Sequence, residues 1–201
     1  MHSGQGEGVR YGFLVDLRRC IGCNSCAVAC KSENDVPLGV FRSWVKQVEK
    51  GSFPATRKAF LPLLCNNCEE PICVTVCPVQ ANKKRPDGIV TYDPHRCVGC
   101  RYCMAACPYE VRYIHPIKRI VEKCHWCMHR VDVGLLPACV EACPVGARVF
   151  GDLNDPQSEI SRLIASNPTQ VLMPEMGTQP RVYYIDFDEA TMSVKRKVRR
   201  W

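Results

Sequence analysis

Sixteen cysteines stand in four blocks of four, and the spacing inside each block predicts the chemistry. The first and third blocks have the spacing C-x2-C-x2-C-x3-C, the second has C-x2-C-x4-C-x3-C, and the fourth has C-x2-C-x11-C-x3-C. In chain order the blocks are Cys20, Cys23, Cys26, Cys30; Cys65, Cys68, Cys73, Cys77; Cys97, Cys100, Cys103, Cys107; and Cys124, Cys127, Cys139, Cys143. Three thiolates on such a tight loop can hold three corners of an iron–sulfur cubane, while the next cysteine points away and serves a neighbouring cluster. Sixteen thiolates are the ligands that four [4Fe–4S] clusters need, so the sequence predicts a row of redox centres.

Three other uses of so many cysteines are possible. Isolated C-x2-C pairs suit a zinc ribbon, but four consecutive blocks of four cysteines, each ending in C-x3-C, do not. An even cysteine count suits a disulfide framework in an exported chain, but C-x2-C-x2-C packs cysteines too densely for ordinary bridges. Radical chemistry with S-adenosylmethionine needs C-x3-C-x2-C, and the position that would complete this motif holds Glu33, Gln80, Glu110 or Gly146. Iron–sulfur clusters are therefore favoured over zinc and disulfides, and the radical motif is excluded.

The formal net charge of +7 would suit a nucleic-acid partner, but it counts the cysteines as neutral. A cubane core with its four thiolates carries a charge of about −2, so four clusters would leave the holoprotein near −1. The basic excess then balances the clusters, and the sequence predicts no nucleic-acid partner.

The sequence predicts no transmembrane helix, because no apolar stretch is long enough to span a bilayer. Residues 1–8 are polar and rich in glycine, without the apolar segment of a signal peptide. We therefore expect residues 1–10 to form a flexible leader.

The order of the blocks predicts an α+β fold made of two pseudo-symmetric, bacterial-ferredoxin-like units, one inserted in the other. Between blocks two and three, Asp87–Asp93 has a turn and a short strand pattern, so residues 65–107 are expected to form the inserted unit. Blocks one and four would form the outer unit, residues 11–64 and 108–150. Strand patterns at Tyr11–Val15 and Ala147–Phe150 flank it.

Shorter elements connect these parts. We expect short helices after the x3 cysteines, near Ala27–Ser32 and Met104–Cys107. Val40–Val48 is predicted to be a linking strand, and Ala59–Leu64 is extended, with Pro62 favouring an edge position.

Residues 151–201 contain no cysteine and are expected to form a C-terminal extension. A capped helix is predicted at Ser158–Ala165 and a late strand at Arg181–Asp186. The extension could wrap a partner or pack on its own domain. It ends in a basic run, Lys195–Trp201, which suits either a solvated tail or contact with anionic lipid or an acidic partner.

Four quartets in this order, with the x11 gap in the fourth, resemble the four-cluster iron–sulfur subunit of the molybdopterin (dimethyl sulfoxide reductase) superfamily. The likeness is strongest to the iron–sulfur subunits of polysulfide, thiosulfate and tetrathionate reductases and related quinone reductase complexes. The motifs that carry it are CVGCRYCMAACPY from Cys97, EKCHWCMHR from Glu122, PACVEACP from Pro137 and FGDLNDP from Phe150. The resemblance covers residues 11–185.

The resemblance implies which cysteines share a cluster. Cluster 1 would be held by Cys20, Cys23, Cys26 and Cys143, and cluster 2 by Cys30, Cys124, Cys127 and Cys139. Cluster 3 would be held by Cys65, Cys68, Cys73 and Cys107, and cluster 4 by Cys77, Cys97, Cys100 and Cys103. Some relatives replace the second cysteine of block three and carry a three-iron centre. This chain keeps Cys100, so we expect four cubanes.

The resemblance also implies a function, partners and a place in the cell. The chain would relay electrons between a large molybdopterin-type catalytic subunit, facing cluster 1, and a quinone-interacting integral-membrane subunit, facing cluster 4. It would sit peripherally on the cytoplasmic membrane, at the periplasmic rather than the cytoplasmic face. A soluble polyferredoxin is the alternative, although a free carrier does not need the extension after residue 150.

Other residues near the ligands are expected to tune the clusters and not to react. Arg101, Tyr102 and Trp126 lie between ligands, where solvent access and hydrogen bonds to sulfur shift potentials. For three histidines close to ligands, supporting or packing roles are expected, since sixteen cysteines complete the count: His95, His125 and His129. The sequence shows no catalytic constellation, so we expect a non-catalytic electron-transfer subunit.

Overall fold

The computed structural model describes residues 8–188. The expected leader, apart from residues 8–10, and the basic run at the end of the chain lie outside the described residues. Among residues 8–188, no helix has both the length and the apolar composition that a bilayer span requires. Small helices and short strands alternate through the fold, which confirms the α+β class.

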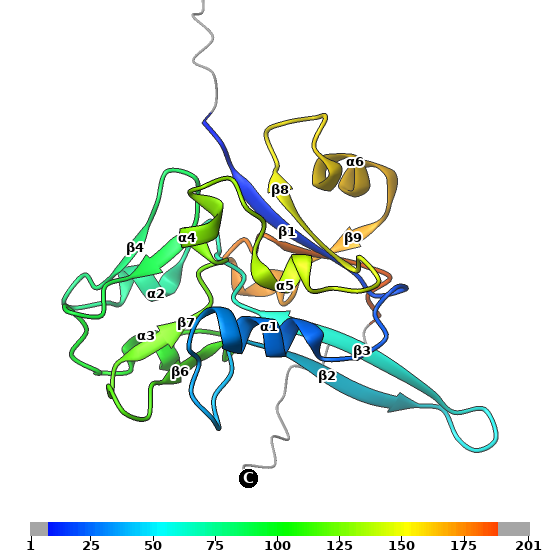
Figure 1. Cartoon of the computed structure of the whole chain (residues 1–201), viewed down its shortest axis with the longest axis horizontal. Coiled ribbons are helices and arrows are strands. Elements are labelled where there is room, and N and C mark those ends of the chain that lie inside the picture. The colour runs from blue at the N-terminus through cyan, green and yellow to red at the C-terminus, as the bar shows by residue number, and fades with distance from the viewer. Residues whose placement is uncertain (1–7, 189–201) are drawn as a thin grey trace, which may run out of the picture.

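A four-stranded sheet joins the two ends of the described chain (Figure 1). Its order is β8 (Arg148–Asp152), β1 (Tyr11–Asp16), β10 (Val182–Ile185) and β9 (Thr169–Gln170). Strand β1 is antiparallel to β8, so the strands expected before block one and after block four pair with each other. Strand β10 lies parallel to β1 on its other side. The expected late strand is thus part of the central sheet.

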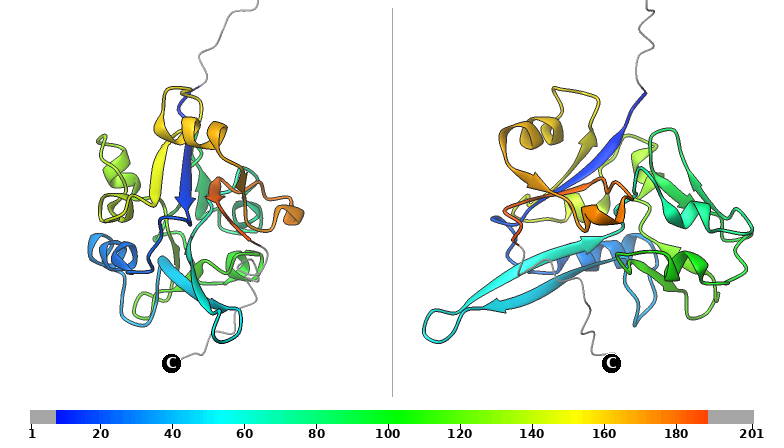
Figure 2. Two further views of the ribbon diagram at one scale, coloured as in Figure 1. Left: turned by 90° about the vertical axis from the view of Figure 1, so that its right-hand side faces the viewer. Right: turned by 180° about the vertical axis from the view of Figure 1, so that it is seen from behind.

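Three antiparallel hairpins connect the cysteine blocks. The longest, β2 (Ser43–Lys50) with β3 (Arg57–Leu64), projects from the body of the molecule as an arm (Figure 2). Because this sheet has only two strands, Pro62 sits in an edge strand, as expected. The two short hairpins are β4 (Asn82–Lys84) with β5 (Val90–Tyr92), and β6 (Arg112–Ile114) with β7 (Val121–Lys123).

The short helices stand in the cysteine blocks. The helix predicted at Ala27–Ser32 is confirmed, and the helix predicted at Met104–Cys107 is right only for its first two residues. Helix α1 (Ser25–Glu33) begins before Cys26, and α3 (Tyr102–Ala105) ends before Cys107. The helices α2 (Ile72–Thr75), α4 (Met128–Val131) and α5 (Ala138–Glu141) have four residues each, as α3 does. Proline after the last cysteine of blocks two, three and four disfavours helix at that cysteine, so α2, α3 and α5 end before it. Lys31 follows Cys30 instead, and α1 alone continues for nine residues.

The backbone repeats between blocks. Gly22 and Gly99, at the same position in blocks one and three, have φ values of 70° and 68°. Two residues later, Asn24 and Arg101 have φ values of 61° and 67° and start α1 and α3. This left-handed conformation favours glycine and asparagine, and it turns the loop sharply after each C-x2-C pair. Blocks one and three therefore adopt the same ligand-loop geometry.

The cysteines are part of the main hydrophobic core. Cys26, Cys65, Cys124 and Cys139 are buried together with aromatic and aliphatic side chains of the central sheet and β3. The extension closes this core, because Leu172, Val182 and Tyr184 belong to the same cluster. Helix α6 (Glu159–Ser166), capped by Ser158 as predicted, covers a second cluster built on Leu14 and Ile160. The described part of the extension thus packs on its own chain.

Candidate iron–sulfur centres

Three cavities are each lined by four cysteines, and each set combines two blocks. One cavity, of about 320 Å³ including its open mouth, is lined by Cys20, Cys23, Cys26 and Cys143. The second, of about 350 Å³, is lined by Cys65, Cys68, Cys73 and Cys107. The third, also of about 350 Å³, is lined by Cys77, Cys97, Cys100 and Cys103. In every case the cysteine after the x3 gap has crossed over to its neighbour's loop.

The remaining four cysteines gather where α1 packs against α5. Burial raises the pKa of Cys124 far above its usual range, and the nearby Cys30, Cys139 and Cys127 thiols add to the rise. The side-chain amide of Asn34 lies 3.6 Å from the Cys127 sulfur and 3.9 Å from the Cys30 sulfur. Blocks one and four therefore meet here a second time.

The donors around these cysteines suit a bound iron–sulfur cubane. Backbone N–H groups four residues after the last cysteine of blocks two and four point back at the sulfur. Ala81 N is 3.2 Å from the Cys77 sulfur, and Ala147 N is 3.3 Å from the Cys143 sulfur. Such N–H groups stabilise thiolate ligands and influence the potential of a cluster. Across residues 8–188, no three His, Cys, Asp or Glu side chains converge on one point as ligands of a single ion do.

The buried thiols hold their protons tightly when no metal competes for the sulfur. Burial, reinforced by neighbouring thiols, raises the pKa of Cys30 and of Cys68 to about 12. At the exposed end of block one, the Ser25 hydroxyl lowers the pKa of Cys23. Because iron binds thiolate, loading most of these sites requires the release of protons at neutral pH.

Comparison with protein families and known sequences also indicates iron–sulfur clusters. Residues 19–81 and residues 56–153 each match a family model described as "4Fe-4S dicluster domain". A tetrathionate reductase subunit of Salmonella typhimurium is 50% identical over 185 residues, 90% of this chain and 74% of the relative. Protein NrfC of Escherichia coli is 44% identical over 93% of this chain and 85% of its own length. The arsenate respiratory reductase iron-sulfur subunit ArrB of Shewanella sp. is 37% identical over 88% of this chain and 96% of its own.

The chain belongs to the family of four-cluster iron–sulfur subunits of molybdopterin-type reductases. It is an electron-transfer subunit with four [4Fe–4S] clusters, and sixteen cysteines are available to bind them.

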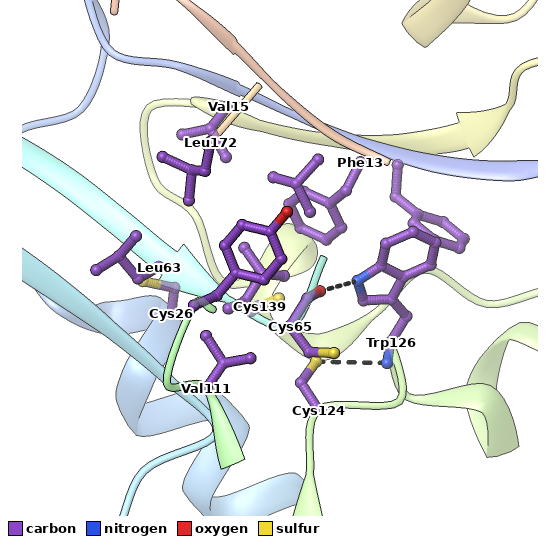
Figure 3. Packing of buried hydrophobic residues seen from close by; sticks show 14 of the residues in the cluster. Phe13, Val15, Cys26, Leu63, Cys65, Val111, Cys124, Trp126, Cys139 and Leu172 are labelled. Carbon is purple, nitrogen blue, oxygen red and sulfur yellow. Dashed lines mark hydrogen bonds between the residues drawn. The ribbon is translucent and has the colours of Figure 1, made fainter. Parts of the chain in front are cut away.

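In this iron–sulfur subunit, Trp126 links two cysteine sets directly (Figure 3). Its backbone N–H lies 3.4 Å from the Cys124 sulfur, and its indole N–H donates to the Cys65 carbonyl oxygen at 3.1 Å. The Trp126 side chain is 1% exposed and stacks edge-on against Phe150. Trp126 thus fixes the spacing between the Cys124 set and the Cys65 set at the centre of the molecule.

The buried Arg42 forms a second link in the iron–sulfur subunit. Its guanidinium donates to the Glu122 carboxylate at 2.8 Å, to Tyr113 at 3.1 Å and to Tyr92 at 3.0 Å. Another Arg42 nitrogen lies 3.1 Å from both Asn34 Oδ1 and His125 Nε2. The network therefore runs from Asn34, beside the Cys30 and Cys127 sulfurs, to Tyr92 in the wall of the Cys77 cavity.

Truncation of this network should be costly. We expect Glu122→Ala to lower the free energy of unfolding by about 3–5 kcal/mol, because it leaves the Arg42 charge buried without its partner. Asp132→Ala, which removes the exposed pair with Arg85, should cost no more than about 1 kcal/mol. Denaturant unfolding of the anaerobic holoprotein measures both. Equal losses in the two variants would contradict a structural role for the buried pair.

The stabilisation by the ion pair of Arg42 and Glu122 depends on pH. Burial raises the pKa of Glu122, but the hydrogen bonds from Tyr113 and Arg42 outweigh it and hold the pKa below its ordinary value of 4.5. The stabilisation is therefore complete above that value and is lost as the pH falls through the lower folded-state pKa.

The other residues singled out from sequence have separate surroundings. Arg101 and Tyr102 are exposed beside Cys100. His125 is buried, and its pKa falls to about 3 through burial and the nearby Arg42 and Lys123 charges. His129 lies 2.7 Å from Glu33 on the surface, and His95 is exposed.

Sequence reasoning missed the buried cations Arg42, Lys123, Arg112 and Arg148. A repeat could have indicated the last two, since each stands five residues after the final cysteine of its block.

Proposed function

We propose that the four cysteine sets are the ligand sets of four clusters in a nested arrangement. Cluster 1 is held by Cys20, Cys23, Cys26 and Cys143, and cluster 2 by Cys30, Cys124, Cys127 and Cys139. Cluster 3 is held by Cys65, Cys68, Cys73 and Cys107, and cluster 4 by Cys77, Cys97, Cys100 and Cys103. Three cavities lined by three of these sets support this assignment. Blocks two and three then form a ferredoxin-like unit, residues 65–107, inserted in the unit built from blocks one and four, residues 11–64 and 108–150.

One observation carries the proposed order of the clusters in the relay. Of the sixteen cysteines, only Cys23 and Cys100 are exposed, and they belong to the first and fourth sets. The segments that contain them, leading into α1 and into α3, lie on opposite sides of the molecule (Figure 1). The Cys65 and Cys124 sets, linked by Trp126, lie between them. Clusters 1 and 4 are therefore the two terminals of the relay, and clusters 2 and 3 are its interior.

The surface around cluster 4 suits a partner with negative charge and an apolar centre. Val98, Tyr102 and Ile117 are exposed there. Four exposed cations surround them, and none forms an ion pair within residues 8–188: Arg96, Arg101, Lys118 and Arg119. The loop that carries Lys118 and Arg119 touches block three, because a Cβ added at Gly99 would lie 2.7 Å from the Arg119 carbonyl oxygen. We name these seven residues the cluster 4 surface.

We propose that the cluster 4 surface docks on an integral-membrane subunit that exchanges electrons with quinone. The opposite terminal, with Ile21 and Val28 exposed near Cys23, docks on a molybdopterin-type catalytic subunit. The resemblance to subunits of respiratory reductases supports both partners. It also supports a peripheral position at the periplasmic face of the cytoplasmic membrane.

Charge reversal tests this function. Arg96→Glu with Lys118→Glu should weaken binding to solubilised native membranes about tenfold, equivalent to about 1.4 kcal/mol, by opposing electrostatic complementarity. The effect should shrink at high salt because salt screens exposed charges. Arg162→Glu, an exposed residue of α6, is the matched control and should bind normally. A chain that neither copurifies with membranes nor responds to these changes would instead be a soluble polyferredoxin carrier.

A further inference from the structure

Two buried arginines occupy equivalent positions in the two halves of the fold. Arg112 follows Cys107 by five residues and begins β6, and Arg148 follows Cys143 by five residues and begins β8. Arg112 is 6% exposed and Arg148 is 3% exposed. The same sequence step thus places a guanidinium inside each half.

Each guanidinium lies between two cysteine sets. Arg148 lines the Cys20 cavity and lies close enough to Cys139 of the second set for their charges to interact strongly. Arg112 lines the Cys65 cavity and interacts in the same way with Cys103 of the fourth set.

Both guanidiniums have donors that no protein group satisfies. Arg148 donates to Ser43 Oγ at 3.0 Å, but its Nη1 has no partner within residues 8–188. Arg112 donates to Asn82 Oδ1 at 3.0 Å, but its Nε and Nη2 have none in that part of the chain. Apart from this hydroxyl and this amide, which carry no negative charge, the groups that the two guanidiniums approach are cysteine thiols, Cys139 for Arg148 and Cys73 for Arg112.

A buried cation without an anion is strongly destabilising, as is a buried N–H group without an acceptor. A cubane and its four thiolates carry a net negative charge of about −2 and offer several sulfur acceptors. The cysteine sets therefore provide what both arginines lack. Both arginines stand five residues after the last cysteine of a block, and both line a cavity of four cysteines. We therefore explain the two buried guanidiniums in the same way.

We propose that Arg148 neutralises and tunes clusters 1 and 2, and that Arg112 neutralises and tunes clusters 3 and 4, each by donating N–H groups to cluster sulfur. This rests on the proposed ligand sets. Reduction adds one electron, and hence one negative charge, to a cluster without making or breaking a covalent bond. A fixed cation stabilises the reduced state more than the oxidised state, so each arginine raises the potential of the clusters that it flanks.

Redox titration of the anaerobic holoprotein, followed by electron paramagnetic resonance, tests the proposal. Arg148→Gln should lower the reduction equilibrium constants of clusters 1 and 2 about tenfold, or about 59 mV for a one-electron couple, and leave cluster 4 unchanged. Arg112→Gln should shift clusters 3 and 4 and leave cluster 1 unchanged. Arg148→Lys and Arg112→Lys, which keep the charge, should restore most of each shift. Arg162→Gln, on the distant α6, should shift none.

Full iron content with unmoved potentials in both glutamine variants would overturn the tuning role, while leaving the ligand sets intact. Failure of the ligand sets would appear differently, as Cys139→Ala and Cys143→Ala variants that lose the same cluster. If the arginine variants fail to fold, a measurement on the wild-type protein tests the proposal instead. When its arginines carry the heavy nitrogen isotope, pulsed paramagnetic resonance of the reduced protein should show a hyperfine coupling to guanidinium nitrogen. Absence of that coupling would also overturn the proposal.

Discussion

Removal of the iron–sulfur clusters should unfold the chain. Seven of the sixteen cysteines are buried, and several belong to the main core, so the clusters occupy space that side chains fill in other proteins. The helices α2 to α5 have four residues each and the strands β4 to β7 have three, which is too short for stability without support. In such a fold the free energy of metal binding supplies the free energy of folding. We therefore expect cluster removal to lower the free energy of unfolding by about 5–15 kcal/mol, which is the whole stability of an ordinary domain.

Anaerobic oxidation and chelation, followed by far-ultraviolet circular dichroism, measures this effect. The apoprotein should lose most of its regular structure and its resistance to proteolysis, and reconstitution with iron and sulfide should restore both. An apoprotein with the spectrum of the holoprotein would show that side-chain packing alone holds the fold.

Loss of an interior cluster should break the relay. Cys139 is buried on α5, and we expect Cys139→Ala to remove cluster 2 and about a quarter of the iron. Electron transfer from quinol to the catalytic subunit should fall to the background rate, because clusters 1 and 3 are then no longer connected. Reduction of the substrate by a dye that donates directly to the catalytic subunit should continue.

The matched control is Val140→Ala, the neighbouring residue on the same helix, which packs against the core but supplies no ligand. It should retain its iron and its quinol activity. Full quinol activity in an iron-depleted Cys139→Ala complex would show that electrons bypass cluster 2.

Local sequence patterns predicted those parts of the structure that depend on neighbouring residues. Cysteine spacing indicated the loops that line the cysteine cavities, and runs of aromatic, aliphatic and β-branched residues predicted β1, β5 and β10. The helix predicted at Ala27–Ser32 is confirmed, whereas the one predicted at Met104–Cys107 extends past the end of α3, because Pro108 disfavours helix at Cys107. The residue that directly follows the last cysteine of a block therefore indicates where the helix ends: proline in blocks two, three and four, and Lys31 in block one.

Other features depend on contacts between distant parts of the chain. The parallel pairing of β1 with β10 joins Phe13 to Val182, and no local pattern identifies such partners. Arg42 meets Glu122 across 80 residues, and Trp126 meets Cys65 across 61. Charged residues such as Arg42 and Lys123 are usually exposed, so composition alone places them on the surface. Only the three-dimensional fold shows them between the cysteine sets.

The most direct test of the nested ligand sets is paramagnetic resonance of three reduced single-cysteine variants. Cys30→Ala and Cys139→Ala lie in different blocks, and we expect both spectra to lack the same cluster. Cys143→Ala lies in the same block as Cys139, and we expect its spectrum to lack a different cluster, the one held by block one. If Cys139→Ala and Cys143→Ala instead lost the same cluster, and Cys30→Ala a different one, each block would hold its own cluster and the nested relay would be wrong.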